Sequence, residues 1–325
     1  MTPRRDWLGL AAALVLLVIG FSLATDHFFS WTTMVALANQ APEALLLATG
    51  MTLVVLTGGI DLSVGSVLAL SAAVFGTAVG SERLGLPAAA GAAVLVGAGC
   101  GVANGWLSSR WRIPSFIVTL AMLEIARGAT YLVTESQTRY LGARVDAITP
   151  DVIGGLRAPV LVAVAVVVVA QWALTHTVIG RHIVAVGAND EAARLAGLDP
   201  RRVRTLAFTL CGALAGLAAV AQTGRLAAAD PNAGIGLELE AIAAVVIGGT
   251  SLAGGRGAIG TSALGALVMA VLGAGLAQMG VQEPTRRLTT GAVIVAAAAA
   301  DVWRRRVWPL VAPVARGHRR GLDLR

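Results

Sequence analysis

The sequence predicts an all-α integral membrane protein, and its composition supports this fold class in two ways. Of the 325 residues, 56% are hydrophobic and only 13% are charged, whereas about 25% are charged in a typical soluble domain. So few charges cannot cover that much apolar surface in water, and the mean hydropathy of +0.77 agrees. The 39 glycines are spread through the apolar runs, as in membrane helices that pack closely.

About ten apolar runs are expected to cross the bilayer as helices, because a span needs about 20 residues. The predicted spans are 7–25, 41–58, 62–80, 86–107, 114–133, 157–175, 204–223, 238–250, 258–280 and 286–303. The first is expected to be an uncleaved anchor, although Ser22-Leu23-Ala24 loosely resembles a signal-peptide cleavage site. The segment 27–39 is too polar for a span, so we expect it to lie at the membrane interface or to re-enter. Residues 1–325 then form a single transmembrane domain.

Arginine asymmetry predicts the orientation, since cytoplasmic loops carry an excess of basic residues. With Arg4 and Arg5 inside, ten spans place 17 of the 25 arginines on the cytoplasmic side, and both termini are cytoplasmic. The basic tail 304–325 is expected to face anionic lipid rather than nucleic acid. The polar loop 134–156 faces the outside, where it can meet an arriving partner.

The residue types exclude several chemistries. Every basic residue is arginine, so the chain lacks the Lys of a phosphate-binding P-loop, and any ATP that drives it is hydrolysed by another subunit. Cys100 and Cys211 form no spaced motif, and the histidines have no metal-ligand spacing. No Ser/His/Asp arrangement or carboxylate pair stands out. We therefore predict no catalytic residue, no metal and no cofactor.

Small residues recur at helical spacing in two of the predicted spans. Gly97, Gly101 and Gly105 repeat every four residues, and Gly212 and Gly216 repeat the same spacing. This pattern predicts close helix packing. Asn104 lies on the same face as Gly97 and Gly101. It is expected either to line a path for a hydroxyl-rich solute or to hydrogen-bond a neighbouring helix.

An ionisable residue, Asp61, lies between two apolar runs, where a charge is costly unless it is paired or wet. Gly58 and Gly59 can break the helix there, and Ser63 or the backbone amides that follow can satisfy the carboxylate. Gly-Gly-x-x-Leu-x-x-Gly occurs at 58–65 and again at 248–255, which hints at an internal duplication. Interrupted helices in related halves often mark a transport path. The alternative is that Asp61 caps a helix at a surface hairpin. The candidate path residues are Gly58, Gly59, Asp61, Ser63, Asn104, Gly248, Gly249, Thr250 and Ser251.

The inner loop 176–203 is the longest predicted cytoplasmic connection. Asn189 or Asp190 can cap a short helix that runs to about Leu198, with Gly197 and Pro200 ending it. Its small-residue face and apolar side chains suit docking into a groove on another protein. The alternative is a structured loop without a partner. The residues of this face and its caps are Gly187, Asn189, Glu191, Ala192, Ala193, Leu195, Ala196 and Gly197.

Three segments together resemble one family. They read Thr57-Gly58-Gly59-Ile60-Asp61-Leu62-Ser63-Val64-Gly65, Gly187-x-Asn189-x-x-Ala192-Ala193-x-x-x-Gly197 and Ile247-Gly248-Gly249-Thr250-Ser251-Leu252-Ala253-Gly254-Gly255-Arg256-Gly257. In their order and approximate spacing they resemble the permeases of ribose/xylose/arabinose-type ABC transporters, and they span most of the chain.

The resemblance implies the membrane subunit of a monosaccharide importer in the bacterial cytoplasmic (inner) membrane. It also implies three partners: a cytoplasmic ABC ATPase docked at 187–198, a periplasmic or lipid-anchored sugar-binding protein, and a second permease subunit in a homodimer or heterodimer. Another solute is an alternative, namely a branched-chain amino acid, a nucleoside or a furanose signal. An ion-coupled secondary transporter is disfavoured, because it usually needs a relay of intramembrane carboxylates. An intramembrane enzyme is disfavoured because no catalytic arrangement occurs.

Overall fold

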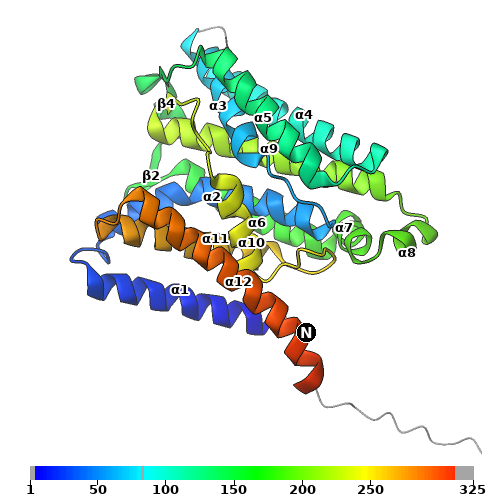
Figure 1. Ribbon diagram of the computed structural model, residues 1–325. Coiled ribbons are helices and arrows are strands. Elements are labelled where there is room, and N and C mark those ends of the chain that lie inside the picture. Colours follow the sequence, from blue (N-terminus) through cyan, green and yellow to red (C-terminus); the bar gives the residue numbers. More distant parts are fainter. Residues whose placement is uncertain (1–3, 82–83, 312–325) are drawn as a thin grey trace, which may run out of the picture.

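The computed structural model describes residues 4–81 and 84–311, and helices dominate it (Figure 1). The helices are α1 (Arg4–Ala24), α2 (Trp31–Leu56), α3 (Val64–Gly80), α4 (Leu86–Trp111), α5 (Ser115–Thr134), α6 (Ala158–His176), α7 (Val178–Ala188), α8 (Asp190–Leu195), α9 (Pro200–Leu226), α10 (Leu237–Ile247), α11 (Ile259–Gln278) and α12 (Glu283–Val311), with a 3-10 helix η1 (Gly142–Ile148). Four short strands are β1 (Arg139–Tyr140), β2 (Asp151–Ile153), β3 (Leu156–Arg157) and β4 (Ala228–Ala229). They form two antiparallel pairs, β1 with β4 and β2 with β3.

The predicted helical membrane fold is confirmed at the level of its helices. In the described part of the chain, six helices are long and apolar enough to cross a membrane: α1, α4, α5, α6, α9 and α11. The four other predicted spans also coincide with helices, namely α2, α3, α10 and α12. With 17 and 11 residues, α3 and α10 are short for a crossing, and each adjoins a glycine-rich break.

The two ends of the helix bundle differ in character (Figure 1). The short helix α8 lies at one end, and the start of α1 and the last turn of α12 lie toward the same side. The strands β2 and β4 lie at the other end. The predicted loop 134–156 therefore carries β1, η1 and β2 at the end opposite α8. Of the predicted basic tail 304–325, residues 304–311 extend α12, and 312–325 lie outside the described residues.

α2 is the central helix of the bundle. Every residue from Ala41 to Leu56 except Ala44 is buried, because α2 packs against α6, α7, α9, α10 and α11. Its apolar side chains therefore face protein rather than lipid.

Of the segment 27–39, residues 31–39 are the first turns of α2, so they do not form a re-entrant element of their own. The interfacial position stays a prediction. The hydroxyl of Ser30 accepts the amide of Thr33 at 3.2 Å and caps α2, which continues without a break from Trp31. The polar side chains of these first turns contact the loop at the end opposite α8. Asn39 donates to the Gly155 carbonyl and accepts the Arg157 amide, each at 2.9 Å. Their polarity reflects these contacts and not a change of helix.

α4 and α9 pack through the two predicted glycine repeats, which face each other. A Cβ at Gly97 would overlap the carbonyl oxygen of Gly212, and the reverse substitution would overlap the carbonyl of Gly97. A Cβ at Gly216 would lie 2.6 Å from the Ala93 oxygen. The small residues thus bring two backbones into contact, which is the packing role predicted for them.

Candidate functional site

The short helix predicted in the inner loop is present as α8. Asn189 caps it, accepting the Ala192 amide at 2.9 Å. It ends at Leu195 rather than near Leu198. Gly197, at φ +84°, lets the chain turn so that the Leu198 amide bonds the Ala193 carbonyl at 3.0 Å. This left-handed glycine closes the helix by satisfying its last carbonyls.

The exposed side of α8 is only part of the predicted docking face. Glu191, Ala192 and Ala196 are exposed, and Leu195 is 86% exposed. Ala193 is 5% exposed, so the expectation that it faces a partner is wrong. Its side chain points into the chain's own interior. Leu195 is thus an apolar side chain of α8 that the rest of the described chain does not cover.

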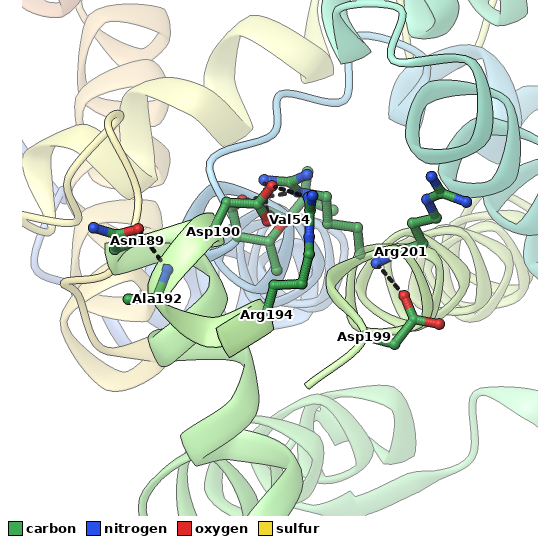
Figure 2. Close-up of polar contacts among 9 residues, drawn as sticks. Val54, Asn189, Asp190, Ala192, Arg194, Asp199 and Arg201 are labelled. Carbon is green, nitrogen blue, oxygen red and sulfur yellow. Dashed lines mark hydrogen bonds and ion pairs between the residues drawn. The ribbon is translucent and has the colours of Figure 1, made fainter. Parts of the chain in front are cut away.

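Charges connect α8 to the end of α2. Asp190 pairs with Arg194 at 3.3 Å within α8 (Figure 2) and with Arg204 of α9 at 3.2 Å. Nε of Arg204 lies 3.5 Å from the carbonyl oxygen of Thr57, the residue that follows α2. Asp199 caps α9 by accepting the Arg201 amide at 3.0 Å (Figure 2). These contacts connect α8 to the start of α9 and to the residue that follows α2.

The two predicted helix breaks end their helices in the same way. Gly58 follows α2 at φ +79° and Gly249 follows α10 at φ +77°. At each break the next amide, that of Gly59 or Thr250, donates to the carbonyl five residues back. A turn of this kind is a common way for a helix to end, so the internal duplication stays a prediction. The two turns align Gly58 with Gly249, one residue away from the sequence repeat that aligns Gly58 with Gly248.

Four glycines from the three motif segments meet in one place, which we call the glycine junction: Gly58, Gly187, Gly254 and Gly255. A Cβ at Gly187, in the last turn of α7, would overlap the Leu56 carbonyl oxygen and lie 2.7 Å from the Gly255 amide nitrogen. That amide donates to the same Leu56 carbonyl at 2.9 Å. A Cβ at Gly254 would lie 2.9 Å from the Gly58 nitrogen and 2.8 Å from the Gly187 oxygen. The segment just before α8 is therefore in backbone contact with both breaks.

Asp61 is buried inside the chain, with 2% of its surface exposed, and is not at a surface hairpin. Its Oδ1 accepts the Ser63 amide at 2.9 Å and the Ser63 hydroxyl at 2.6 Å. The Ser63 oxygen in turn accepts from Nδ2 of Asn104 on α4 at 2.9 Å. Of the two roles expected for Asn104, the structure provides the hydrogen bond to a neighbouring segment. Asp61, Ser63 and Asn104 brace the first break against α4.

The backbone of the first break is satisfied by hydroxyl groups of α5. The amide of Ile60 donates to Ser115 at 3.0 Å, and that of Leu62 donates to Thr119 at 3.1 Å. Non-helical backbone at membrane depth needs such partners, because lipid offers none. At the second break, Thr250 lies 3.2 Å from the Ser262 hydroxyl, and the Ser251 amide donates to Arg256 at 2.8 Å.

Two cavities flank these elements. One of about 570 Å³ lies beside α8, and Gly58 and Gly59 form part of its wall. Its charged lining residues are Arg112, Asp190, Glu191, Arg194, Arg201 and Arg204. Asp61, Ser63, Asn104, Thr250 and Ser251 are buried, and neither they nor Gly248 and Gly249 line this cavity. Of the candidate path residues, only Gly58 and Gly59 border it.

The other cavity, of about 530 Å³, contains charged residues that the predicted candidate site does not include. It lies between α2, α10, α11 and α12, and its lining includes Glu43, Arg225 and Glu240. Nη2 of Arg225 pairs with Oε1 of Glu43 at 2.7 Å. The predicted span 204–223 ended before Arg225. The sequence signal that could have found this pair is Arg225 at the end of one apolar run, because an arginine there can neutralise a carboxylate, such as Glu43, in another run.

The fold and this site define a helical membrane protein with a short, exposed helix, α8, at one end. Among the described residues, no group of three or more His, Cys, Asp or Glu side chains could hold a metal ion. The chain belongs to the family described as branched-chain amino acid transport system / permease component, whose model matches residues 33–298. It is therefore a permease component of a transport system rather than an enzyme.

Relatives named as sugar import permeases cover most of the chain. The chain is 40% identical over 309 residues to the ribose import permease protein RbsC of Escherichia coli (strain K12), covering 91% of this chain and 95% of that protein. It is 37% identical over 306 residues to the fructose import permease protein FrcC of Rhizobium meliloti, covering 90% and 84%. The D-allose transport system permease protein AlsC of Escherichia coli (strain K12) is 34% identical over 292 residues, with 89% of each covered. No solved structure gives a significant match.

Proposed function

We propose that this chain is the membrane-spanning permease subunit of a bacterial ABC importer for a monosaccharide, with ATP hydrolysed by a separate subunit. The observation that carries the proposal is the glycine junction, where the segment before α8 contacts both helix breaks. The relatives named for ribose, fructose and D-allose support a sugar as the solute. They favour it over the branched-chain amino acid in the family description and over an ion-coupled carrier.

The proposed topology has ten spans, formed by α1–α6 and α9–α12, in one domain that covers residues 1–325. Both termini and α8 lie on the cytoplasmic side of the inner membrane, and the loop 134–156 lies outside. The asymmetry of the arginines and the position of the start of α1 on the side of α8 (Figure 1) support this orientation.

In the proposed mechanism, the ATPase docks on the exposed face of α8, through Glu191, Ala192, Leu195 and Ala196. Closure of the ATPase pair on ATP moves α8 as a unit. Two contacts transmit the movement: the Asp190–Arg204 pair, which reaches the end of α2, and Gly187, which touches both breaks. The breaks then shift against their braces, so that the path opens to the other side.

In this proposal the candidate path residues form the two helix breaks, or hold them, and the shift of these breaks opens or closes the path. Gly58 and Gly59 border the cavity beside α8, where a solute would leave toward the cytoplasm. Asp61, Ser63, Asn104, Gly248, Gly249, Thr250 and Ser251 hold the breaks in the present conformation. A second permease subunit completes the path, and a periplasmic or lipid-anchored binding protein delivers sugar at the end opposite α8.

The test is uptake of labelled sugars into proteoliposomes that contain this chain, its ATPase and its binding protein. The panel is D-ribose, D-fructose, D-allose and L-arabinose, with L-leucine for the amino acid alternative. We expect uptake of one or more sugars that requires both ATP and the ATPase. Uptake of leucine alone, or uptake by this chain without the ATPase in an ion gradient, would contradict the proposal.

A further inference from the structure

The cavity between α2, α10, α11 and α12 runs deep into the bundle from the end opposite α8. Along α2 its lining extends from Thr32 to Leu47, a rise of about 22 Å in a helix. The amide of Gln278 donates to the Thr33 hydroxyl at 3.1 Å across its outer end, between α11 and α2. Its volume of about 530 Å³ is within the range of small-molecule sites, about 300–1,000 Å³.

A buried, oriented carboxylate forms part of the cavity wall. Oε1 of Glu43 accepts from Nε and Nη2 of Arg225 at 2.9 and 2.7 Å, and Oε2 accepts from Gln222 at 3.0 Å. Glu43 is 9% exposed. Three donors from α9 therefore hold the carboxylate in one position, and charge-assisted bonds of this kind are the strong ones.

Two further polar side chains of the lining have no hydrogen-bond or ion-pair partner among the described residues. Gln40, one turn before Glu43 on α2, and Glu240 on α10 both line the cavity. Ionisable and amide groups inside a membrane protein are costly unless they meet water, a partner or a ligand. Gln40 and Glu240 are exposed in this chain taken alone, and Arg286 of α12 also lines the cavity. Water or a polar ligand, rather than lipid, is therefore the partner that these groups favour.

We infer that this cavity is a binding site within the subunit for a neutral polyhydroxylated solute, on the route from the outer face to the helix breaks. The inference rests on the proposed function and names where the sugar is held. The carboxylate of Glu240 accepts hydroxyl protons, and the amide of Gln40 both donates and accepts, which matches vicinal hydroxyl groups. None of the described lining residues is aromatic, so the site lacks a stacking surface and binds weakly, as a transit site should.

The test uses a single reporter cysteine in the cavity wall, Ala270→Cys, in a chain whose Cys100 and Cys211 are replaced by Ala. A small membrane-impermeant thiol reagent labels the reporter in the complete complex, without ATP and without the binding protein. We expect D-ribose, or whichever sugar of the panel is imported, to slow labelling, and L-leucine to have no effect. Gln40→Leu and Glu240→Gln should raise the half-protecting sugar concentration by about tenfold, as loss of a hydrogen bond to a charged or amide group does.

The matched control is Glu238→Gln on the same helix. Glu238 is outside the cavity lining, and its Oε1 accepts the Gly236 amide at 3.2 Å, a bond that glutamine can keep. It should leave sugar protection unchanged. Labelling at the normal rate without sugar shows that each variant is folded. Sugar import with no protection of Ala270→Cys, or protection unchanged in both cavity variants, overturns this inference and leaves the proposed function standing. Absence of any sugar import contradicts the proposed function itself.

Discussion

Gly187→Ala tests whether the glycine junction couples α8 to the helix breaks. The added Cβ would overlap the Leu56 carbonyl oxygen and lie 2.7 Å from the Gly255 nitrogen, whereas real Cβ contacts are essentially never under 3.0 Å. α7 must therefore move away from α2 and from the second break. The substitution destroys or lengthens the bond from the Gly255 amide to Leu56, now 2.9 Å.

The magnitude follows from three terms. Overpacking of a close contact costs about 1–3 kcal/mol, and the lost buried hydrogen bond costs about 1 kcal/mol. Alanine gains about 1 kcal/mol over glycine in a helix. The expected net loss in the free energy of unfolding is about 1–3 kcal/mol. Function should suffer more than stability, because the displaced segment is the one that joins α8 to both breaks.

The assay compares Gly187→Ala with Gly99→Ala, a glycine of α4 that is exposed and has no atom within 4 Å of an added Cβ. Thermal unfolding in detergent measures stability. ATP hydrolysis and sugar uptake in proteoliposomes of the full complex measure coupling. We expect Gly187→Ala to keep ATP hydrolysis but lose most uptake per ATP, while Gly99→Ala behaves as the unmodified chain. If the two variants have equal stability and equal uptake, the contact at Gly187 carries no coupling and the reasoning is refuted.

Three further substitutions test other parts of the structure. Gly97→Ala should lower the unfolding free energy by about 1–3 kcal/mol, because its Cβ overlaps the Gly212 carbonyl; a thermal stability equal to that of Gly99→Ala would argue against the α4–α9 contact. Asn104→Leu should lower the free energy of unfolding by about 1 kcal/mol, because it removes the hydrogen bond to Ser63. It should also make the first break more mobile, which hydrogen exchange would detect as faster exchange of the amides of residues 60–63. Unchanged exchange would mean that Asn104 does not hold the first break in place. Arg225→Met should cost about 3 kcal/mol, because Glu43 is left buried without its counter-charge, and adding Glu43→Gln should recover most of the loss; a double variant as unstable as the single one would contradict this pairing.

The positions of the helices could be predicted from the sequence because one rule applies along the whole chain: a membrane-spanning helix needs about 20 mostly apolar residues. Apolar runs near the required length marked the spans, and each coincides with a helix. The helix breaks were also predictable, since Gly58 and Gly249 adopt positive φ that other residues resist. The rule fails for 31–39, where polar residues such as Asn39 belong to α2 because they contact the loop 154–157.

The arrangement of the candidate site could be predicted only in part. Asn189 and Gly197 cap the two ends of α8 through bonds to residues a few positions away, so these caps could be predicted from the sequence. Which face of α8 is buried is decided by tertiary packing, and Ala193 therefore lies on the inner side. The contact between Gly187 and both breaks, and the pairing of Glu43 with Arg225, join segments far apart in the chain. No local pattern in a single sequence encodes such pairings.

The measurement that tests the account most directly is the affinity of the ATPase subunit for this chain in detergent, with and without Leu195→Asp. Leu195 is 86% exposed on α8, and a charge there should oppose burial against a partner. The control is Ile153→Asp, 73% exposed on β2, at the end opposite α8. The account predicts that Leu195→Asp weakens ATPase binding at least about tenfold, a loss of about 1.4 kcal/mol, and that Ile153→Asp leaves it unchanged. Equal binding by the Leu195→Asp chain and the unmodified chain would contradict the claim that ATP hydrolysis drives transport through α8.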